Sequence, residues 1–444
     1  GLHDEEFIRD RTENFDEVKK MVSQYTPEKV EEIAGIPREQ LIAAARLYGK
    51  AERAAIIYSM GITQHTTGTD NCLSLANLAM LTGNIGREGT GVNPLRGQNN
   101  VQGACDVGAL PSFYPGYRRV NEAAAREKFE GAWGVKLPQR DGLTVVEIMN
   151  AAHEGKIKGL YIMGENPMLS DPNLNHVKEA LENLEFLVVQ DIFLSETAQL
   201  ADVVLPGVSF AEKDGTFTST ERRVQRVRKA IPAVGQSRQD WEIISEVSSR
   251  LGYPMSYRSP SEVMDEVASL VPIYGGIRYD RLDGDGLQWP CPNPEHPGTP
   301  YLHKDQFTRG KGLFTGVSYL PPAELPGDGY PFLLTTGRIL YHYHTIMSRR
   351  SKALDRLVPE GFLEVNPSDA EKLGIKDHDL VRVSSRRGQI DTRAKVTERV
   401  REGTVFATFH FAEAAANLLT IDALDPVAKI PEYKVCAVRL EPCG

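Results

Sequence analysis

Short apolar runs, each ending in turn residues and followed by a helical pattern, recur along the first half of the chain. The strand-like runs cover residues 54–58, 158–163, 186–190 and 202–205. Apolar residues at helical spacing follow the first three of them, at 70–81, at about 172–184 and at 196–200. Short buried strands that alternate with helices predict parallel sheets with helices on both faces. We therefore expect an α/β fold with doubly wound, mostly parallel, Rossmann-like sheets.

The carboxyl ends of the predicted strands are the places where we expect a ligand. In sheets of this kind, ligands bind in the crevice beyond those ends. Polar and glycine-rich residues follow each strand, at 60–64, 164–166, 190–191 and 206–207. Backbone donors there suit a pyrophosphate, and a carboxylate such as Asp191 suits a ribose or a base edge. Taken singly, Asn166 and Asp191 are also good helix caps by residue type.

The two ends of the chain have different patterns. Residues 5–50 carry apolar side chains at helical spacing and predict two or three amphipathic helices, whereas residues 254–330 are rich in Pro, Gly and Asp and are interpreted as a connecting region. Beyond them the pattern is strand-like, with Gly388 at a hairpin turn. The predicted strands cover 332–336, 362–365, 380–384, 389–396 and 404–411, with one small helix at 368–373. This pattern indicates a β-barrel-like C-terminal domain.

Charge and hydropathy exclude several classes of protein. Against 60 Asp and Glu residues there are 51 Lys and Arg residues, which gives a net charge of −9 and argues against a nucleic-acid surface. No apolar run approaches the roughly 18–20 residues of a membrane span. The N-terminal residues lack the basic and apolar regions of a signal peptide, and we expect none there. It begins in a charged helical pattern, as expected of the middle of a larger protein or of a short processed N-terminus.

The number and spacing of the cysteines limit which disulfides and metal sites the chain can form. There are five, an odd number, and no two have CxxC spacing. We therefore expect neither a disulfide framework nor a self-contained zinc or iron–sulfur site. A reducing compartment fits best, and the predicted location is cytoplasmic.

The densest polar stretch, residues 83–103, is rich in glycine and in Asn and Gln amides. It predicts neither a helix nor a central strand. An exposed flexible loop is the simplest interpretation, but inward-pointing amides need partners, and a ligand rich in donors and acceptors would supply them. Gly97 allows a close approach of the backbone. Its neighbour Arg96 offers a planar fork suited to a carboxylate or a phosphate.

At this stretch a family resemblance becomes specific. The run LRGQNNVQGACDVGALP at 95–111 closely resembles the catalytic subunits of formate dehydrogenases, which belong to the molybdenum or tungsten enzymes with bis-molybdopterin guanine dinucleotide. The resemblance covers essentially the whole chain, and RGQNNVQG is its most formate-typical part. Supporting stretches are YSMGITQHTTGTDN (58–71), MGENPMLSDPN (163–173), VVQDIF (188–193), ADVVLPG (201–207), EKDGTFTSTERRVQ (212–225) and PEYKVCAV (431–438).

The resemblance implies an architecture. It divides the chain into the C-terminal part of a pterin-binding α/β domain (1–98), a second α/β dinucleotide-binding domain with the connecting region (99–325), and a six-stranded double-psi-like β-barrel domain that binds the molybdopterin dinucleotide (326–444). The family also carries a [4Fe–4S] domain and a Cys or selenocysteine followed by His at the metal. No such segment occurs here, so we expect the metal ligand and the cluster upstream of Gly1 and no metal ligand in this chain.

The resemblance also implies roles for particular residues. In the family the Arg of the RGQNN motif pairs with formate, and that role carries to Arg96; pairing with a structural carboxylate or a cofactor phosphate is the alternative. The other expected cofactor contacts fall into three groups. Pterin contacts are Met60, Gln64 and Gln98, with Gly97 beside them as a further cofactor-binding position. Guanine-nucleotide contacts are Gly164, Glu165, Asn166, Gln190, Asp191 and Gly207. Contacts from the barrel are Arg338, His342, His344, His410, Asn417, Tyr433 and Lys434.

A metal site at His342, His344 and His410 is an alternative that we disfavour, because no carboxylate partner is evident. The predicted function is therefore part of a formate dehydrogenase catalytic subunit, oxidising formate to CO₂ and passing two electrons to an iron–sulfur cluster. Electron-transfer iron–sulfur proteins and the rest of the subunit are the expected partners. The alternatives are another bis-pterin enzyme, such as a nitrate reductase-like oxidoreductase, and an inactive cofactor-binding fragment; this chain alone is predicted to be inactive.

Overall fold

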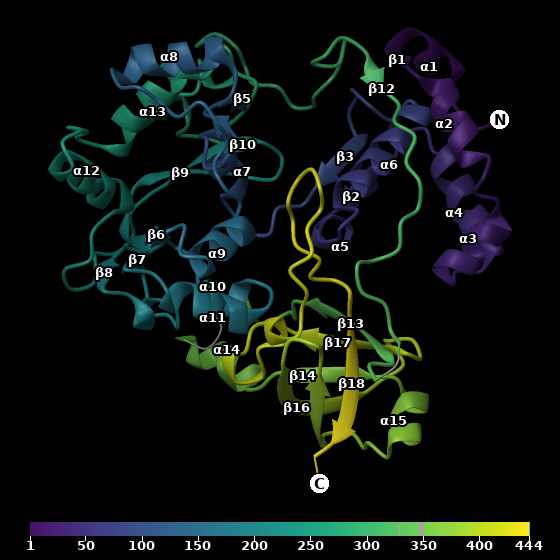
Figure 1. Cartoon of the computed structure of the whole chain (residues 1–444). Helices are drawn as coiled ribbons and strands as arrows, with labels where there is room; N and C mark the ends of the chain where they lie inside the picture. The colour runs from purple at the N-terminus through teal and green to yellow at the C-terminus, as the bar shows by residue number, and fades with distance from the viewer. Residues whose placement is uncertain (328, 346–349, 444) are drawn as a thin grey trace.

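The computed structural model describes residues 1–327, 329–345 and 350–443. In the view of Figure 1 the N-terminal region, coloured purple to blue, lies at the upper right, and the central α/β region lies at the left. The C-terminal barrel, green to yellow, lies at the bottom. The loop that precedes the last strand rises from the barrel towards the N-terminal region.

The N-terminal region starts with four short helices, one more than the upper number predicted. They are α1 (Glu5–Arg11), α2 (Phe15–Val22), α3 (Pro27–Ala34) and α4 (Arg38–Lys50). Asp4 caps α1 by accepting a hydrogen bond from the backbone N–H of Phe7 at 2.9 Å, which satisfies one of the free donors of the first turn. Gly35, at φ +63°, ends α3.

A parallel pair of strands follows. Strand β2 (Ala55–Tyr58) pairs in register with β3 (Gly91–Pro94), and the helices α5 (Met60–Thr63) and α6 (Gly68–Leu81) lie between them in the chain. Strand β3 and the first residues of helix α7 (Val101–Asp106) fall within 83–103, so the prediction that this stretch holds no helix is wrong for residues 101–103. The prediction that it holds no central strand is not contradicted, because β3 is one strand of a two-stranded sheet. Pairing with β2 satisfies the backbone of this glycine-rich segment, which its own sequence would leave irregular.

The central region contains the predicted α/β unit. Strands β6 (Gly159–Met163), β7 (Phe186–Asp191) and β8 (Val203–Pro206) form a parallel sheet in that order. Side chains of helices α9 (Val145–His153) and α11 (Leu174–Glu182) join those of β6 and β7 in one apolar core. Burial of this apolar surface is the main force that holds the layers together. The shorter elements α10 (Pro167–Ser170) and η1 (Ala198–Leu200) connect the strands.

The rest of the central region is more ordered than its composition indicated. The interpretation of 254–330 as a mere connection is wrong for α13 (Pro260–Leu270), whose Met264 and Ala268 are buried. The Pro at its first helical position is compatible with a helix start. The remaining elements of this region and of the links to its neighbours are β4 (Phe113–Tyr114), β5 (Arg118–Arg119), α8 (Ala123–Trp133), η2 (Phe210–Glu212), β9 (Gly215–Thr218), β10 (Arg223–Val227), α12 (Asp240–Arg250), η3 (Pro272–Tyr274), η4 (Tyr279–Arg281) and β11 (Leu287–Gln288). Strand β1 (Thr12–Glu13) pairs with β12 (Gly312–Leu313).

The C-terminal part forms a closed six-stranded barrel, which confirms the predicted fold class. Its strands are β13 (Phe332–Gly337), β14 (Phe362–Val365), β15 (Leu380–Ser384), β16 (Gln389–Val396), β17 (Thr404–Thr408) and β18 (Cys436–Pro442). They are arranged in the order β13-β17-β14-β16-β15-β18. The smaller elements are α14 (Lys352–Leu357), α15 (Pro367–Leu373), η6 (Ala412–Ala414) and η7 (Ala416–Leu418). Closure leaves no free edge in the sheet.

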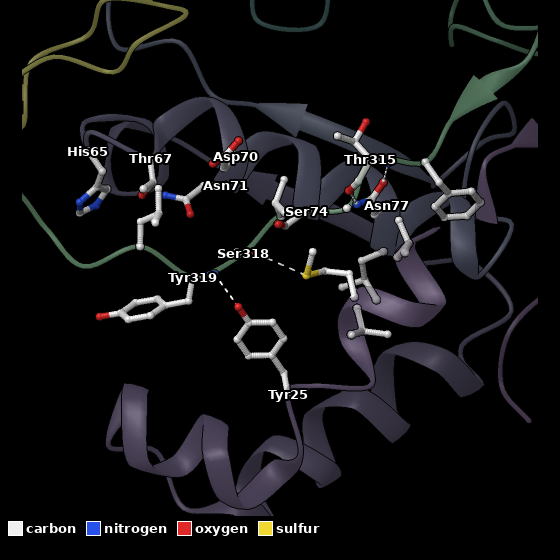
Figure 2. A pocket seen from close by; sticks show the side chains of 18 of the residues that line it. Tyr25, His65, Thr67, Asp70, Asn71, Ser74, Asn77, Thr315, Ser318 and Tyr319 are labelled. Carbon is white, nitrogen blue, oxygen red and sulfur yellow. Dashed lines mark hydrogen bonds between the residues drawn. The ribbon is translucent and has the colours of Figure 1, made fainter. Parts of the chain in front are cut away.

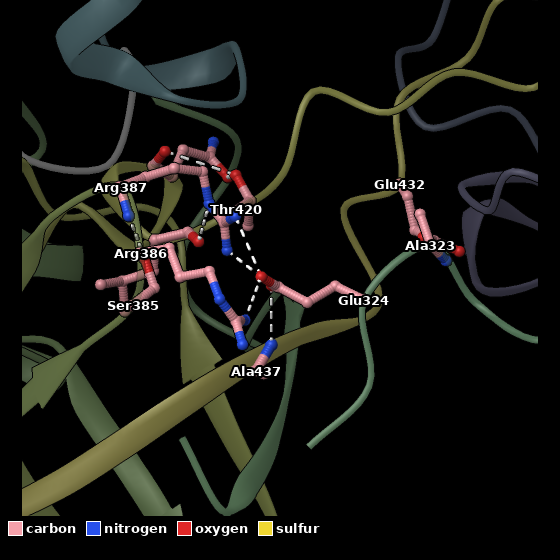
Figure 3. Close-up of polar contacts among 10 residues, drawn as sticks. Ala323, Glu324, Ser385, Arg386, Arg387, Thr420, Glu432 and Ala437 are labelled. Atoms are coloured by element: carbon pink, nitrogen blue, oxygen red, sulfur yellow. Dashed lines mark hydrogen bonds and ion pairs between the residues drawn. The ribbon is translucent and has the colours of Figure 1, made fainter. Parts of the chain in front are cut away.

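A carboxylate fastens the incoming segment to the barrel (Figure 3). Glu324 is 9% exposed and accepts hydrogen bonds from Arg386, from Arg387 and from the backbone N–H of Ala437, the last at 2.9 Å. One residue earlier, the N–H of Ala323 donates to Glu432 at 2.9 Å. Since Glu324 and Glu432 are both buried, these contacts fix how the connecting segment enters the barrel.

No helix within the described residues is long and apolar enough to cross a membrane. The predicted domain boundaries at 98 and 325 remain a proposal.

Candidate active site

A cavity of about 380 Å³ lies at the carboxyl ends of β6 and β7, where the strand order predicted a ligand site. Residues 98 and 99, which follow β3, and residues 343–345 of the barrel region also line it. Seven of the predicted site residues meet here: Gln98, Gly164, Glu165, Asn166, Gln190, Asp191 and His344. Three parts of the chain that are far apart in sequence therefore build one cavity.

The cavity contains carboxylates with elevated pKa values. Burial raises the pKa of Glu165, and the neighbouring Asp191 raises it further. The pKa of Asp191 is raised mainly by burial, although its Oδ1 accepts hydrogen bonds from the N–H groups of Ile192 and Phe193. Its Oδ2 is buried and has no partner among the described residues. An unpartnered buried carboxylate oxygen is costly, so it favours a bound donor such as a base edge or a hydroxyl group.

A lysine and an aspartate that the sequence analysis did not select also line this cavity. Lys213 donates to Asp240 Oδ2 at 2.6 Å, and Asp240 Oδ1 accepts from Gln190 Nε2 at 2.8 Å. Tyr161 donates to Gln190 from the other side. Lys213 lies within the quoted stretch EKDGTFTSTERRVQ, so the motif was a usable signal; Asp240 at the start of α12 had none.

Three predicted contacts have other partners in the described structure. Asn166 is 1% exposed, and its Oδ1 accepts from the N–H and hydroxyl of Thr197 at 3.1 and 2.8 Å. Asn417 donates to the carbonyl of Leu169 at 2.8 Å and so joins the barrel region to α10. Gly207 packs so that an added Cβ would lie 3.1 Å from Asp240 Oδ1. Gly207 therefore leaves room for Asp240, which lines the cavity, and of the two amides only Asn166 lines it.

Arg96 follows β3 and is exposed, but hydrogen bonds hold its backbone N–H and its Nε. Its Nε donates to Gln102 Oε1 at 3.1 Å, and its backbone N–H donates to Thr220 at 3.0 Å. Gln102 is in turn fixed by the buried Asp106, which accepts from it at 2.8 Å. Within the described residues, neither terminal nitrogen of Arg96 has a hydrogen-bond partner. A guanidinium held through Nε with two free terminal nitrogens can bind a carboxylate in a bidentate manner.

A second guanidinium lies next to the same loop. An added Cβ on Gly97 would be 3.1 Å from Arg338 Nη2, so glycine at this position lets the loop and Arg338 approach each other. Arg338 Nε and Nη2 are buried and have no partner among the described residues. Tyr343 and Phe409 pack against the guanidinium, with 5.4 and 5.9 Å between Arg338 Cζ and the ring centroids. Burial lowers the pKa of Arg338.

Further nitrogen groups surround Arg338. Lys434 donates to the carbonyl of Thr336 at 2.7 Å, and burial, followed by the proximity of Arg338, lowers its pKa to about 8. Burial and the same arginine lower the pKa of His344 to about 4. No carboxylate pairs with either Arg338 or Lys434 within the described residues. Such a buried cationic cluster is costly without an anion and well suited to a phosphate.

Hydrogen bonds occupy most of the ring nitrogens of the three histidines of the barrel region for which contacts are described. His410 donates through Nδ1 to the carbonyl of His344 at 2.7 Å, and its Nε2 accepts from the N–H of Ile339 at 3.2 Å. His342 binds the carbonyl of Val358 at 2.7 Å and leaves Nδ1 buried without a partner. The segment that holds His342 and His344 follows the end of β13 and is not part of a strand.

Tyr433, another of the contacts predicted from the barrel, lies close to the α/β sheet. The pKa of Tyr433 lies well above its ordinary value because the phenol is buried and because Asp171 and Glu165 are near. Burial raises the pKa of Asp171 to about 7, and its Oδ2 has no partner among the described residues. Tyr433 and Glu165 therefore place the 431–438 motif beside the carboxyl end of β6.

Met60 and Gln64 do not line the 380 Å³ cavity. They follow β2, while Arg96 follows β3, and the N–H of Leu95 donates to the carbonyl of Tyr58 at 2.7 Å. Because β2 and β3 are parallel, Met60 and Arg96 lie at the same edge of that small sheet. The structure thus associates them with Arg96 and not with the residues at the ends of β6 and β7.

A larger cavity of about 580 Å³ lies elsewhere, between α2, α6 and residues 314–322 (Figure 2). Its lining is mainly apolar, with His65, Asp70 and Ser74 along α5–α6. None of the predicted site residues lines it. We place the candidate site at the smaller cavity and the adjoining Arg96 loop, because the unpartnered Oδ2 of Asp191 lies at that cavity and the unpartnered nitrogens of Arg338 lie beside Gly97.

Comparison with known proteins identifies the family of the chain. Residues 24–250 match the family described as molybdopterin oxidoreductase, and residues 332–437 match the molydopterin dinucleotide binding domain. Among solved structures, acetylene hydratase from Pelobacter acetylenicus has a TM-score of 0.74 and 18% sequence identity, and the match covers 100% of this chain and 68% of that one. At this identity the likeness concerns the fold alone.

Curated relatives are much closer in sequence. The F420-dependent formate dehydrogenase subunit alpha of Methanocaldococcus jannaschii is 53% identical over 446 residues, covering 99% of this chain and 66% of the relative. Formate dehydrogenase H of Escherichia coli is 44% identical over 450 residues, covering 100% of this chain and 63% of the relative. The chain thus spans about two thirds of the length of the relatives that it matches.

Proposed function

Because the chain belongs to the molybdopterin oxidoreductases, we propose that it is the cofactor-binding part of a formate dehydrogenase catalytic subunit, which oxidises formate to CO₂. The arrangement of Arg96 carries this proposal: its Nε is held by Gln102, and its two terminal nitrogens are free among the described residues. Formate is a small carboxylate, and a planar guanidinium matches both of its oxygens. The identity of 53% to an F420-dependent formate dehydrogenase subunit alpha adds support.

The residues around the cavity fit a pair of molybdopterin guanine dinucleotides. Lys213 lines the cavity, and Arg338 lies beside Gly97 of the adjoining loop with two buried nitrogens that have no partner among the described residues. With Lys434, they would hold anionic phosphates. Asp191 and Glu165 would accept hydrogen bonds from guanine or ribose. When bound, the cofactor supplies a molybdenum or tungsten centre that takes up two electrons. Gln98, Met60 and Gln64 are proposed pterin contacts.

The contribution of this chain to the reaction is positioning and electrostatics. Arg96 binds the two oxygens of formate and orients its C–H bond. Holding the substrate in one geometry lowers the entropic part of the activation barrier. The buried network behind Gln102 keeps the guanidinium from turning away. Gln98 and Asn99, which lie in the same loop as Arg96, line the cavity.

Electrons would then pass to a [4Fe–4S] cluster and on to iron–sulfur partner proteins. The five cysteines form no disulfide, and among the described residues no cysteine belongs to a group of side chains that could hold a metal ion. We therefore propose that the cluster ligands and the metal's thiolate come from a part of the subunit outside this chain. On this view the 444-residue chain alone does not oxidise formate.

The test uses the full-length subunit loaded with cofactor. We expect formate to reduce an artificial dye, and nitrate to give no oxidation of the reduced dye. Nitrate turnover without formate turnover would instead support a nitrate reductase-like enzyme and overturn the proposal. Formate oxidation by the isolated chain would contradict the assignment of the metal ligand to another part of the subunit.

A further inference from the structure

A second polar cluster lies on the two helices that cover the central sheet, away from the cofactor cavity. It consists of His153, the last residue of α9, and of His176 and Glu179 on α11. One ligand atom from each of the three residues lies within 4.8 Å of the other two. None of the three lines the 380 Å³ cavity.

The helices fix these side chains on one surface. His176 and Glu179 are three residues apart on α11 and so project from the same face of that helix. The rings of His153 and His176 have centroids 4.5 Å apart, and His153 Nδ1 lies 3.8 Å from a carboxylate oxygen of Glu179. Because α9 and α11 share the apolar core under the sheet, their backbones do not have to move for the three groups to converge.

The surroundings orient the ligands. His176 Nε2 lies 2.8 Å from Asn150 Oδ1, and in the neutral ring that donates this hydrogen bond Nδ1 carries the lone pair that can bind a metal. Asn183 donates to the carbonyl of His153 at 3.1 Å and ties the end of α9 to the end of α11. A histidine whose second nitrogen is hydrogen-bonded to an oxygen is the usual arrangement at metal sites.

We propose that His153, His176 and Glu179 bind one divalent transition metal ion, with Zn²⁺ as the best fit. Two imidazoles and a carboxylate are zinc ligands, and water completes the coordination at an exposed site. A tetrahedral Zn²⁺ with bonds of about 2.0–2.1 Å separates its ligands by about 3.3 Å. The His153–Glu179 distance of 3.8 Å needs only a small side-chain movement to reach that value. Bound here, the ion clips α9 to α11 and is distinct from the redox metal.

The proposal is tested by titrating the full-length subunit with Zn²⁺ in chelator-treated buffer. We expect one saturable site, weakened at least tenfold in His176→Gln and in Glu179→Gln. Glu182→Gln is the matched control, because Glu182 is exposed on the same helix but pairs with Lys178. Co²⁺ gives a second readout: we expect the visible spectrum of a four-coordinate ion in the wild type and in Glu182→Gln only. Equal Zn²⁺ binding by all variants, or no saturable site in the wild type, would overturn the proposal.

Discussion

Gln102 accepts a hydrogen bond from Arg96 Nε at 3.1 Å, and its side chain links this exposed arginine to the fully buried carboxylate of Asp106. Through its amide nitrogen Gln102 donates to Asp106, which is 0% exposed. The hydroxyls of Tyr117 and Tyr274 donate to the two oxygens of Asp106 at 2.7 and 2.6 Å. The network is buried and fully paired, so it holds Gln102, and through it Arg96, in one orientation.

We predict that Asp106→Asn lowers kcat/KM for formate in the full-length enzyme. An amide offers one acceptor oxygen, so one tyrosine hydroxyl loses its partner and the support of Gln102 loosens. An unpaired buried group costs about 1–3 kcal/mol, which corresponds to roughly 5- to 150-fold if it acts on the transition state. Steady-state kinetics at equal cofactor content measure this effect, with the exposed Asp141→Asn as control. Unchanged kinetics in a folded Asp106→Asn enzyme would show that the network does not position Arg96.

Arg96→Lys is predicted to raise KM for formate and to lower kcat. The ammonium of lysine is a point charge and cannot bind both carboxylate oxygens in the plane of a fork. It also lacks the Nε–H that donates to Gln102. Formate titrations with the cofactor-loaded enzyme separate the two constants. If both stay at the wild-type values, Arg96 does not bind the substrate.

The helices and strands of the α/β and barrel regions could be predicted from local pattern, because their periods are written in the sequence. The predicted run at 158–163 became β6 (Gly159–Met163), and 389–396 became β16 with the same bounds. Strand β3 could not be predicted in this way. Its glycine-rich sequence gains strand structure only by pairing with β2, which is a tertiary effect. Strand β18 was likewise missed, because its first three residues are all buried and show no alternation.

The candidate site was predictable where residue type and strand end coincide, as for Glu165 and Asp191. Asp240 was not, because it lies at the start of α12 and reaches the cavity only through the packing of α12 beside the sheet. The sequence also could not indicate that the amide of Asn417 donates to the carbonyl of Leu169, because these two residues lie far apart in the chain, in different regions of the fold. Chemistry by residue type thus selects candidates, and the three-dimensional arrangement decides which atoms remain free.

Glu324→Gln is predicted to destabilise the folded chain by about 2–3 kcal/mol, because Glu324 accepts charge-assisted hydrogen bonds from Arg386 and Arg387. Burial alone would raise the pKa of this carboxyl, but the bonds from Arg387 and from the N–H of Ala437 outweigh it and lower the pKa. The stabilisation is therefore present above the unfolded pKa of about 4.3 and is lost as the pH falls through the folded pKa.

Urea unfolding at pH 7 and at acidic pH measures the contribution of Glu324. We expect the difference between wild type and Glu324→Gln to shrink in acid. Glu360→Gln is the control, because Glu360 is an exposed carboxylate near the barrel whose ion pair with Arg393 spans 3.8 Å. A difference that does not depend on pH would mean that shape, and not charge, is what Glu324 contributes.

Lys434→Met is predicted to stabilise the cofactor-free subunit while weakening its retention of cofactor. The pKa of Lys434 is lowered from 10.5 to about 8, mainly by burial and then by Arg338, so the fold carries a penalty for the charged form. After allowing for the lost hydrogen bond to Thr336, removing this charge gains about 2 kcal/mol at pH 7. Without the lysine, the phosphates of the cofactor lose one of their cations, so the molybdenum or tungsten content per subunit should fall.

The pH dependence gives the sign of this effect independently. Between about 8 and 10.5 the unfolded chain binds a proton at Lys434 that the folded chain lacks, so the wild-type cofactor-free subunit gains stability as the pH rises through this window. Lys434→Met should lose that gain, whereas the exposed control Lys376→Met should keep it. A bound phosphate group stabilises the ammonium, raises its pKa and so flattens the wild-type curve in the loaded subunit. Identical curves for wild type and Lys434→Met without cofactor would show that the fold does not lower the pKa of Lys434, and the predicted penalty for its charged form would be refuted.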